Sequence, residues 1–159
     1  MNKAIFPGSF DPITVGHQSV IERALPLFDE IVIAVGINAT KNSLYSVEQR
    51  IKWIEKCFAN QPKISVKSFS ELTVEFCIKE KANYILRGLR TSADFEFERG
   101  IGQVNKILKP EIETIFMLTS TAHTPISSSI VRDVIKHNGD ISQLVPEAII
   151  NEIINHKNR

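Results

Sequence analysis

The chain contains few of the residues that build disulfide frameworks and zinc centres. Cys57 and Cys77 are its only cysteines, and they lie far apart without a paired histidine motif. We therefore expect two reduced, partly buried thiols and no zinc site. No signal peptide precedes the first apolar run, and no apolar run approaches the ~20 residues that span a membrane. These absences predict a cytoplasmic protein.

The charge balance argues against another set of functions. The formal net charge is +1 at pH 7, so the chain as a whole has no electrostatic attraction to nucleic acid or to an acidic membrane. A local basic site for a small anion remains open. The sequence lacks a G-x-x-x-x-G-K-[ST] motif, and Gly100 and Gly102 form only a partial dinucleotide-binding pattern inside an expected helix. We therefore reject both standard nucleotide signatures.

What the sequence does contain is a regular alternation of strand and helix patterns. Its 43% hydrophobic and 23% charged residues suit one soluble domain over residues 1–159. The run EIVIAVGI from Glu30 is typical of a strand buried on both faces, and Ser46 and Gln49 form a capping-box pattern before an apolar helical stripe. Strands are expected near residues 2–6, 30–37, 63–69, 83–88 and 113–118, and helices near 16–27, 46–58, 72–81, 92–108, 127–137 and 146–156. This order predicts an α/β fold: a single doubly wound, Rossmann-like domain with a five-stranded parallel sheet flanked by helices.

The loop after the first expected strand has the composition of an anion site. Ligands of such folds bind at the carboxyl ends of the strands, and the loop GSFDPITVGH (residues 8–17) should lie there. Gly8 permits an unusual backbone angle or close approach of a ligand, and Thr14 is a plausible N-cap. Gly16 leaves the free N–H groups of the first helical turn open to a phosphate, beside His17 as a hydrogen-bond donor. Taken alone, a capped turn with a surface histidine is the better explanation of this loop.

Charged residues follow the fourth expected strand. Arg87 and Arg90 flank a glycine in RGLR, which suits binding of phosphate groups at a strand end. Asp94 and Glu98 lie one helical turn apart in DFEFE, where they could pair with the arginines or accept from a ribose hydroxyl. For an isolated pair of arginines, surface solubilisation would be the simpler explanation.

A serine run and a lysine complete the expected edge. Ser127, Ser128 and Ser129 in ISSSIVR offer hydroxyl and N–H donors at a helix start, where ordinary capping explains one serine well and three less well. Lys41, after the second strand, adds a cation. Several basic or amide-rich loops converging with a histidine indicate a polyphosphate ligand. Because no nucleophilic triad, carboxylate pair or metal cluster is evident, we expect transfer at phosphorus by positioning and charge stabilisation.

These motifs also resemble those of a known family. GSFDPITVGH resembles the T/H-x-G-H signature of the nucleotidylyltransferase superfamily, and ISSSIVR resembles its second signature, I-S-S-T/S-x-x-R. Together with RGLR and DFEFE they resemble the bacterial phosphopantetheine adenylyltransferase family, from Ala4 to about Ile149. The resemblance implies reversible transfer of AMP from ATP to 4′-phosphopantetheine, giving dephospho-CoA and pyrophosphate in the penultimate step of coenzyme A synthesis.

The resemblance also implies roles for individual residues. His17 would stabilise the transition state and Lys41 would orient the attacking phosphate, while phosphopantetheine would be bound by Ser9, Lys41, Thr73 and Arg87. The residues implied to contact ATP are Ser9, Phe10, His17, Gly88, Leu89, Arg90, Glu98, His123, Thr124, Pro125, Ile126, Ser127, Ser128 and Ser129. Mg²⁺ would be bound mainly through the substrate phosphates, with no protein metal site. A homohexamer inhibited by coenzyme A is the implied assembly.

Two alternatives stay open at this point. The first is a related nucleotidyltransferase acting on another phosphate, such as nicotinamide mononucleotide or glycerol phosphate. The second is a catalytically silent nucleotide-binding regulator. A substrate panel separates the first from the implied enzyme, and ATP binding without turnover on any acceptor would favour the second. A smaller question concerns Gly100 and Gly102, each of which costs ~1 kcal/mol in a helix relative to alanine; they either loosen the helix or allow closer packing.

Overall fold

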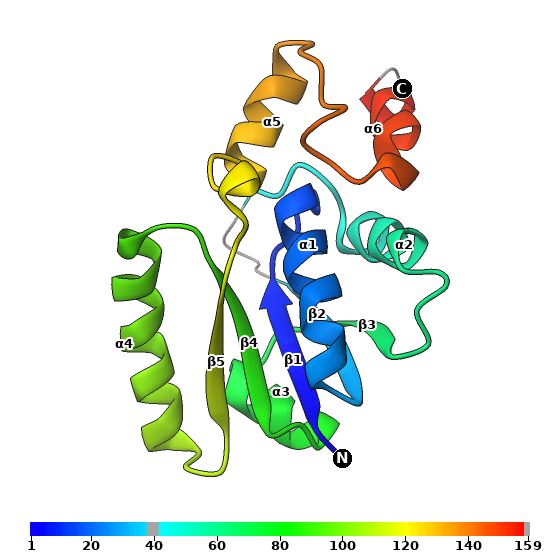
Figure 1. The fold of residues 1–159 in the computed structure, drawn as a ribbon. Coiled ribbons are helices and arrows are strands. Elements are labelled where there is room, and N and C mark those ends of the chain that lie inside the picture. The colour runs from blue at the N-terminus through cyan, green and yellow to red at the C-terminus, as the bar shows by residue number, and fades with distance from the viewer. Residues whose placement is uncertain (38–41, 158–159) are drawn as a thin grey trace.

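The computed structural model describes residues 1–37 and 42–157, and within them strands and helices alternate as predicted (Figure 1). The strands are β1 (Lys3–Gly8), β2 (Glu30–Gly36), β3 (Ile64–Phe69), β4 (Tyr84–Leu89) and β5 (Glu113–Leu118). The α-helices are α1 (Val15–Ala24), α2 (Val47–Cys57), α3 (Thr73–Glu80), α4 (Ser92–Leu108), α5 (Ser128–Lys136) and α6 (Ile150–Lys157). Short 3₁₀ turns are η1 (Leu25–Leu27), η2 (Thr121–His123) and η3 (Glu147–Ile149).

The strands of the described residues form one five-stranded parallel sheet in the order β3-β2-β1-β4-β5. The central strand is β1, where Ile5 lies opposite Val32 on one side and Ile85 on the other. The chain moves outward from β1 to β3 and then returns to the opposite side of β1 at β4. Strand order therefore reverses between β1 and β4, and the crevice at their carboxyl ends is where ligands bind in such sheets. The predicted fold class is confirmed.

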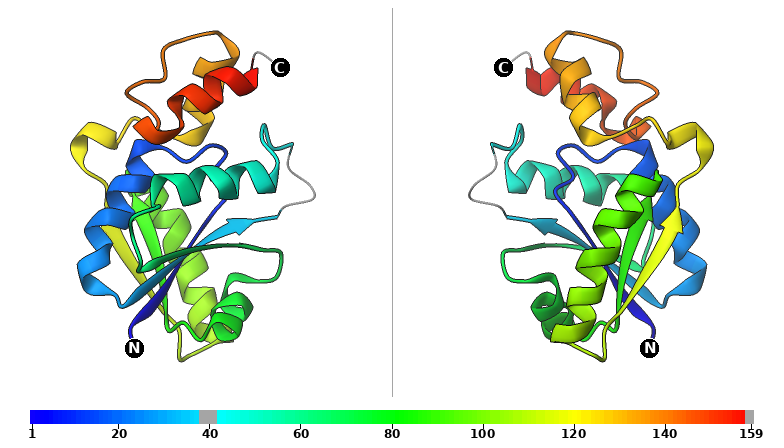
Figure 2. Two further views of the ribbon diagram at one scale, coloured as in Figure 1. Left: turned by 90° about the vertical axis from the view of Figure 1, so that its right-hand side faces the viewer. Right: turned by 90° about the vertical axis from the view of Figure 1, so that its left-hand side faces the viewer.

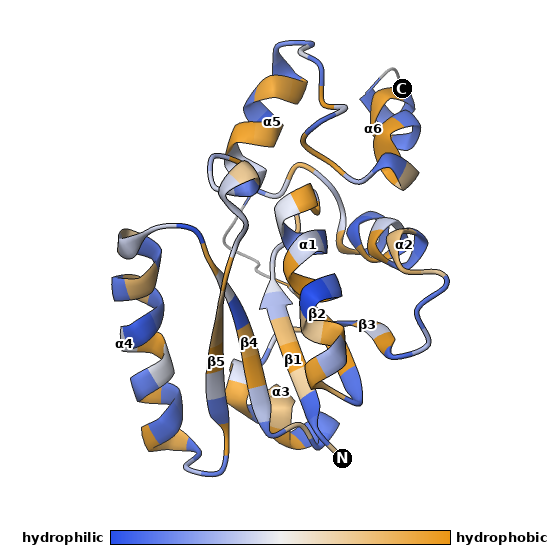
Figure 3. Cartoon of the chain, in the orientation of Figure 1, coloured by the Kyte–Doolittle hydropathy of each residue, from blue (hydrophilic) through white to orange (hydrophobic). Residues whose placement is uncertain are grey.

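Helices cover both faces of the sheet, as the two side views of Figure 2 show. Side chains alternate along β1: Phe6 joins the larger core with Ile21 of α1 and Trp53 of α2, whereas Ile5 packs in a second core with Phe76 of α3. The strands are correspondingly apolar along their middle sections (Figure 3). No helix in the described part of the chain is both long and apolar enough to cross a membrane.

The structure corrects the predicted end of the first helix and answers the question about the two glycines of α4. The predicted helix to residue 27 stops at Ala24 and continues as η1, because Pro26 has no N–H for the α-helical hydrogen bond. In α4 the two glycines serve different purposes. A Cβ on Gly102 would lie 3.4 Å from Thr114 Oγ1 of β5, whereas a Cβ on Gly100 would meet nothing within 4 Å. Gly102 therefore allows close helix–sheet packing, whereas no neighbour among the described residues requires a glycine at position 100.

Candidate functional site

Two cavities open at the carboxyl ends of β1 and β4. The first, of about 430 Å³, is lined by the opening loop, the start of α1, the start of α4 and the start of α5. The second, of about 260 Å³, extends between the ends of β1 and β2, α3 and α4. Both cavities are lined by Pro7, Gly8, Ser9, Arg87 and Glu98. The site therefore consists of two adjoining cavities that meet at the end of β1.

The opening loop folds tightly over the end of β1. Phe10 adopts a φ of 48°, so the left-handed backbone lies at this residue and not at Gly8, where the pattern allowed it. Gly8 is required for another reason: a Cβ there would lie 3.0 Å from the Phe10 ring. That ring packs edge-on against the imidazole of His17, with centroids 5.0 Å apart. The loop thus positions the histidine through an aromatic contact.

His17 belongs to a capping box at the start of α1. The Thr14 hydroxyl accepts a hydrogen bond from the His17 backbone N–H at 3.3 Å, which confirms Thr14 as the N-cap. In return, His17 Nδ1 accepts the backbone N–H of Thr14 at 3.1 Å. Because Nδ1 is an acceptor, the proton of a neutral ring is on Nε2. Nε2–H is then the donor that the ring offers to a ligand.

Electrostatics keep that ring neutral. Burial, and then the positive charges of Arg87 and Arg90, lower the pKa of His17 from 6.5 to about 4. At neutral pH the imidazole therefore carries no charge, and its basic nitrogen is engaged by the helix cap. This geometry suits a hydrogen-bond donor and does not suit a proton-abstracting base.

Two arginines form separate ion pairs with acids of α4, and Arg87 lies within β4 instead of after the strand as the sequence predicted. Arg87 donates to both carboxylate oxygens of Glu98, at 2.9 and 2.5 Å, and to the Pro7 carbonyl at 2.5 Å. Arg90 pairs with Asp94 at 3.2 Å, and the same carboxylate accepts the Arg90 backbone N–H. Of the two roles that the sequence left open for these acids, the structure shows pairing with the arginines. Arg87 is held between β1 and α4 where the two cavities join, whereas Arg90 lines only the first.

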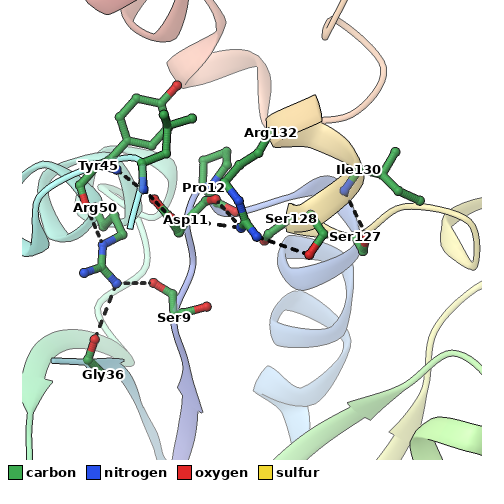
Figure 4. A network of polar contacts seen from close by, with 12 residues as sticks. Ser9, Asp11, Pro12, Gly36, Tyr45, Arg50, Ser127, Ser128, Ile130 and Arg132 are labelled. Atoms are coloured by element: carbon green, nitrogen blue, oxygen red, sulfur yellow. Dashed lines mark hydrogen bonds and ion pairs between the residues drawn. The ribbon is translucent and has the colours of Figure 1, made fainter. Parts of the chain in front are cut away.

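The three serines at the start of α5 make different hydrogen bonds, and Figure 4 shows Ser127 and Ser128. Ser127 is the N-cap of α5 and accepts from the Ile130 N–H at 3.2 Å. Ser128 Oγ donates to the Pro12 carbonyl at 2.8 Å, and Ser129 Oγ accepts from Arg132 at 3.2 Å. Ser127 and Ser128 line the first cavity, and Ser129 does not. One serine caps the helix, as expected, Ser128 connects α5 to the opening loop, and Ser129 contacts Arg132 within α5.

The structure brings together most of the residues predicted from the sequence. Those lining the first cavity are Ser9, Phe10, His17, Gly88, Arg90, Glu98, Ile126, Ser127 and Ser128. Thr73 and Arg87 line the second with Ser9. The predicted residues that line neither cavity are Leu89, His123, Thr124, Pro125 and Ser129. Lys41 lies outside the described residues.

Sequence reasoning did not single out two buried charges beside the site, Asp11 and Arg50. Asp11 accepts the backbone N–H groups of Leu44 and Tyr45 at 2.8 and 2.9 Å. Arg50 lies on α2 and reaches the opening loop (Figure 4). A signal for Arg50 was present, because it falls on the same helical face as Val47 and Ile54, where a charged residue is unexpected.

The chain is similar in sequence and in fold to known proteins. Residues 5–134 match the model of the cytidylyltransferase-like family. The chain is 54% identical to a phosphopantetheine adenylyltransferase of Flavobacterium johnsoniae, covering 94% of this chain and 97% of that protein. It is 55% identical to that of Flavobacterium psychrophilum, covering 94% and 98%. A solved bifunctional NMN adenylyltransferase/ADP ribose pyrophosphatase from Francisella tularensis shares the fold, with a TM-score of 0.77, 15% identity, and coverage of 99% and 50%.

Proposed function

The chain belongs to the cytidylyltransferase-like family and, within it, to the phosphopantetheine adenylyltransferases, and we propose that its two adjoining cavities hold the two substrates of that reaction. ATP occupies the first cavity and 4′-phosphopantetheine the second. A phosphate oxygen of phosphopantetheine attacks the α-phosphorus of ATP, the bond to the β-phosphate oxygen breaks, and dephospho-CoA and pyrophosphate form. The observation that carries this proposal is that Ser9 and Arg87 line both cavities where they meet.

His17 stabilises the charge that develops at the reacting phosphorus. Its neutral ring donates through Nε2–H, since Nδ1 is occupied by the helix cap. The attacking phosphate is already ionised at neutral pH, so the reaction needs no general base. A donor held in place before the reaction acts on the transition state more than on bound ATP. Lys41, outside the described residues, is proposed to neutralise and orient the attacking phosphate.

The walls of each cavity suit the substrate assigned to it. Arg90, Gly88 and the N–H groups at the start of α5 offer donors to the triphosphate of ATP. Thr73 and Arg87 offer a hydroxyl and a cation to phosphopantetheine. The carboxylate of Glu98, proposed as an ATP contact, also holds the Arg87 guanidinium in a bidentate pair. Leu89 and the segment 123–129 are proposed to bind the rest of the nucleotide.

Mg²⁺ fits this site as an ion carried by substrate phosphates. Among residues 1–37 and 42–157, no group of three His, Cys, Asp or Glu side chains is placed to hold a metal. The acids of the first cavity, Asp94 and Glu98, are paired with arginines. Mg²⁺ commonly takes few protein ligands and several phosphate oxygens. Bound in this way, it would neutralise charge on the pyrophosphate leaving group.

An assembly of several copies is also proposed, with the homohexamer as its form. On α4, Phe97, which also lines the first cavity, and Ile107 are 70% and 78% exposed, and Leu118 on β5 is 71% exposed. Apolar residues recur between polar ones along α4 in Figure 3. Within the described residues β5 pairs only with β4, which leaves an edge strand beside the apolar helix. Such a surface favours contact between copies. A cytoplasmic location and feedback inhibition by coenzyme A complete the proposal.

A pyrophosphate-release assay tests the function. We expect turnover only when ATP, Mg²⁺ and 4′-phosphopantetheine are present together. Nicotinamide mononucleotide and glycerol phosphate serve as alternative acceptors in the same assay. Release above the blank with either of them, and none with phosphopantetheine, would assign the site to a different acceptor. ATP binding by calorimetry with no turnover on any acceptor would identify a silent nucleotide-binding protein.

A further inference from the structure

Arg50 is a buried arginine that contacts three separate segments at the edge of the site. Its side chain, on α2, is only 3% exposed. Nη1 donates to the Ser9 carbonyl at 2.6 Å and to the Gly36 carbonyl at 3.4 Å, while Nε donates to the Tyr45 carbonyl at 3.2 Å. Figure 4 shows the guanidinium between these groups. One side chain therefore links the opening loop, the end of β2 and the residues that precede α2.

The hydrogen bonds of this arginine differ from those of Arg87 and Arg90. Every hydrogen bond that it makes to the described residues goes to a main-chain carbonyl, whereas Arg87 and Arg90 each bind a carboxylate. The nearby acid, Asp11, uses its carboxylate oxygens on the N–H groups of Leu44 and Tyr45. A buried cation bound only by carbonyls is a poor source of stability compared with apolar packing. Its planar guanidinium instead fixes the relative positions of the carbonyl groups that it binds.

The segments that Arg50 joins are those that form the boundary between the cavities. Ser9 lines both cavities, and Gly36 lines the second. Arg50 itself lines neither, so it has no direct route to a ligand. Other carbonyls of the same loop are held from the opposite side, that of Asp11 by Arg132 at 2.9 Å and that of Pro12 by Ser128. The opening loop is thus held by hydrogen bonds from α2 on one side and from α5 on the other. Arg50 makes the hydrogen bond from α2.

We propose that Arg50 is a positioning residue for the transfer reaction: by holding the Ser9 carbonyl against the end of β2, it orients Ser9 and the phosphate-binding loop without touching either substrate. The inference rests on the proposed function. Small displacements of groups that align two reactants reduce turnover strongly, by ~100-fold for about 1 Å. Loss of the Arg50 contacts therefore acts on the alignment of bound substrates more than on their binding.

The test compares Arg50→Lys with wild-type protein in the pyrophosphate assay. Lysine keeps the charge, but a single ammonium cannot reach the Ser9, Gly36 and Tyr45 carbonyls together. We expect kcat per folded molecule to fall about 10- to 100-fold, with the KM for ATP changing less than about threefold. The folded fraction is measured by circular dichroism at the assay temperature. Arg50→Met, which removes the charge, is assayed in parallel.

Trp53→Phe is the matched control. Trp53 is buried on the same helix and loses its hydrogen bond to Glu152 in this variant, and no hydrogen bond to Ser9 or Gly36 is lost with it. It should lose stability and keep its kcat per folded molecule. Arg50→Lys with kcat within twofold of wild type, or a loss equal to that of the control, would overturn the proposal. If neither Arg50 variant folds, Arg50 is required for folding itself, and the proposal is also overturned. Wild-type protein that releases no pyrophosphate would instead refute the proposed function.

Discussion

The neutral state of His17 makes a quantitative prediction about acid stability. Folding lowers the pKa of this imidazole from 6.5 to about 4. Between these two values the unfolded chain binds a proton that the folded chain excludes, so the free energy of unfolding falls as the pH falls. Linkage gives a loss of about 2 kcal/mol between pH 7 and pH 5. Because the ring lines a cavity, solvent screening reduces this, and we expect about 1 to 2 kcal/mol.

His17→Gln isolates this contribution. Glutamine at the same position can accept the Thr14 N–H and keep the capping box, while removing the titrating group. Urea unfolding is followed at pH 7, 6 and 5 through the fluorescence of Trp53, the only tryptophan, which is buried. The two proteins should have similar stability at pH 7, and the variant should lose less at pH 5. Other acids titrate equally in both proteins, so parallel profiles of stability against pH would refute the neutral, buried histidine.

A second variant, His17→Ala, tests the role of His17 in the reaction, because glutamine would keep an amide N–H donor in the site and alanine has none. Removing one hydrogen-bond donor to developing charge typically lowers kcat about 10²- to 10³-fold. Binding of ATP, measured by calorimetry, should change less than about threefold, because the contact strengthens in the transition state. Equal losses of binding and rate would mean that His17 recognises ground-state ATP and does not stabilise the transition state.

The remaining predictions concern the glycines and the cysteines. Gly100→Ala should raise the free energy of unfolding by up to about 1 kcal/mol, because its Cβ enters open space. Gly102→Ala should raise the free energy of unfolding by less, because its Cβ lies against Thr114. It should also raise the KM for phosphopantetheine, because residue 102 lines the second cavity. Burial raises the pKa of Cys57 and of Cys77 to about 12, so a thiol reagent at pH 8 should modify both far more slowly in folded protein than in urea. Equal Tm changes for the two glycine variants, or fast labelling of folded protein, would contradict these expectations.

The order of the elements and the position of the opening loop could be predicted from the sequence. The apolar run from Glu30 is a strand buried on both faces, and the capping patterns at Thr14 and Ser46 begin helices where expected. These features depend on residues within a few positions of one another, so propensity and periodicity are sufficient. Helix α1 ends at Ala24, before the residue 27 that the apolar periodicity predicts, because Pro26 cannot donate an α-helical hydrogen bond.

The site itself was only partly accessible from the sequence. The motifs indicated that His17, Arg87 and Arg90 would lie at one edge of the sheet, and they line the first cavity. The sequence could not tell which acid each arginine would bind, since that depends on how α4 rests against β4. It also could not assign the proton to Nε2 of His17, which follows from the hydrogen bond that Nδ1 accepts.

The sequence by itself determined the α/β class, the helix caps and the loops that carry polar groups, because each depends on local backbone preferences. Only the tertiary structure decided which distant groups meet. The ring of Phe10 leaves little room for a Cβ at Gly8, and a Cβ at Gly102 would lie against Thr114 of β5. Arg50 joins the carbonyls of three segments that are separate in the sequence. Such contacts depend on distances between packed elements, which no local pattern encodes.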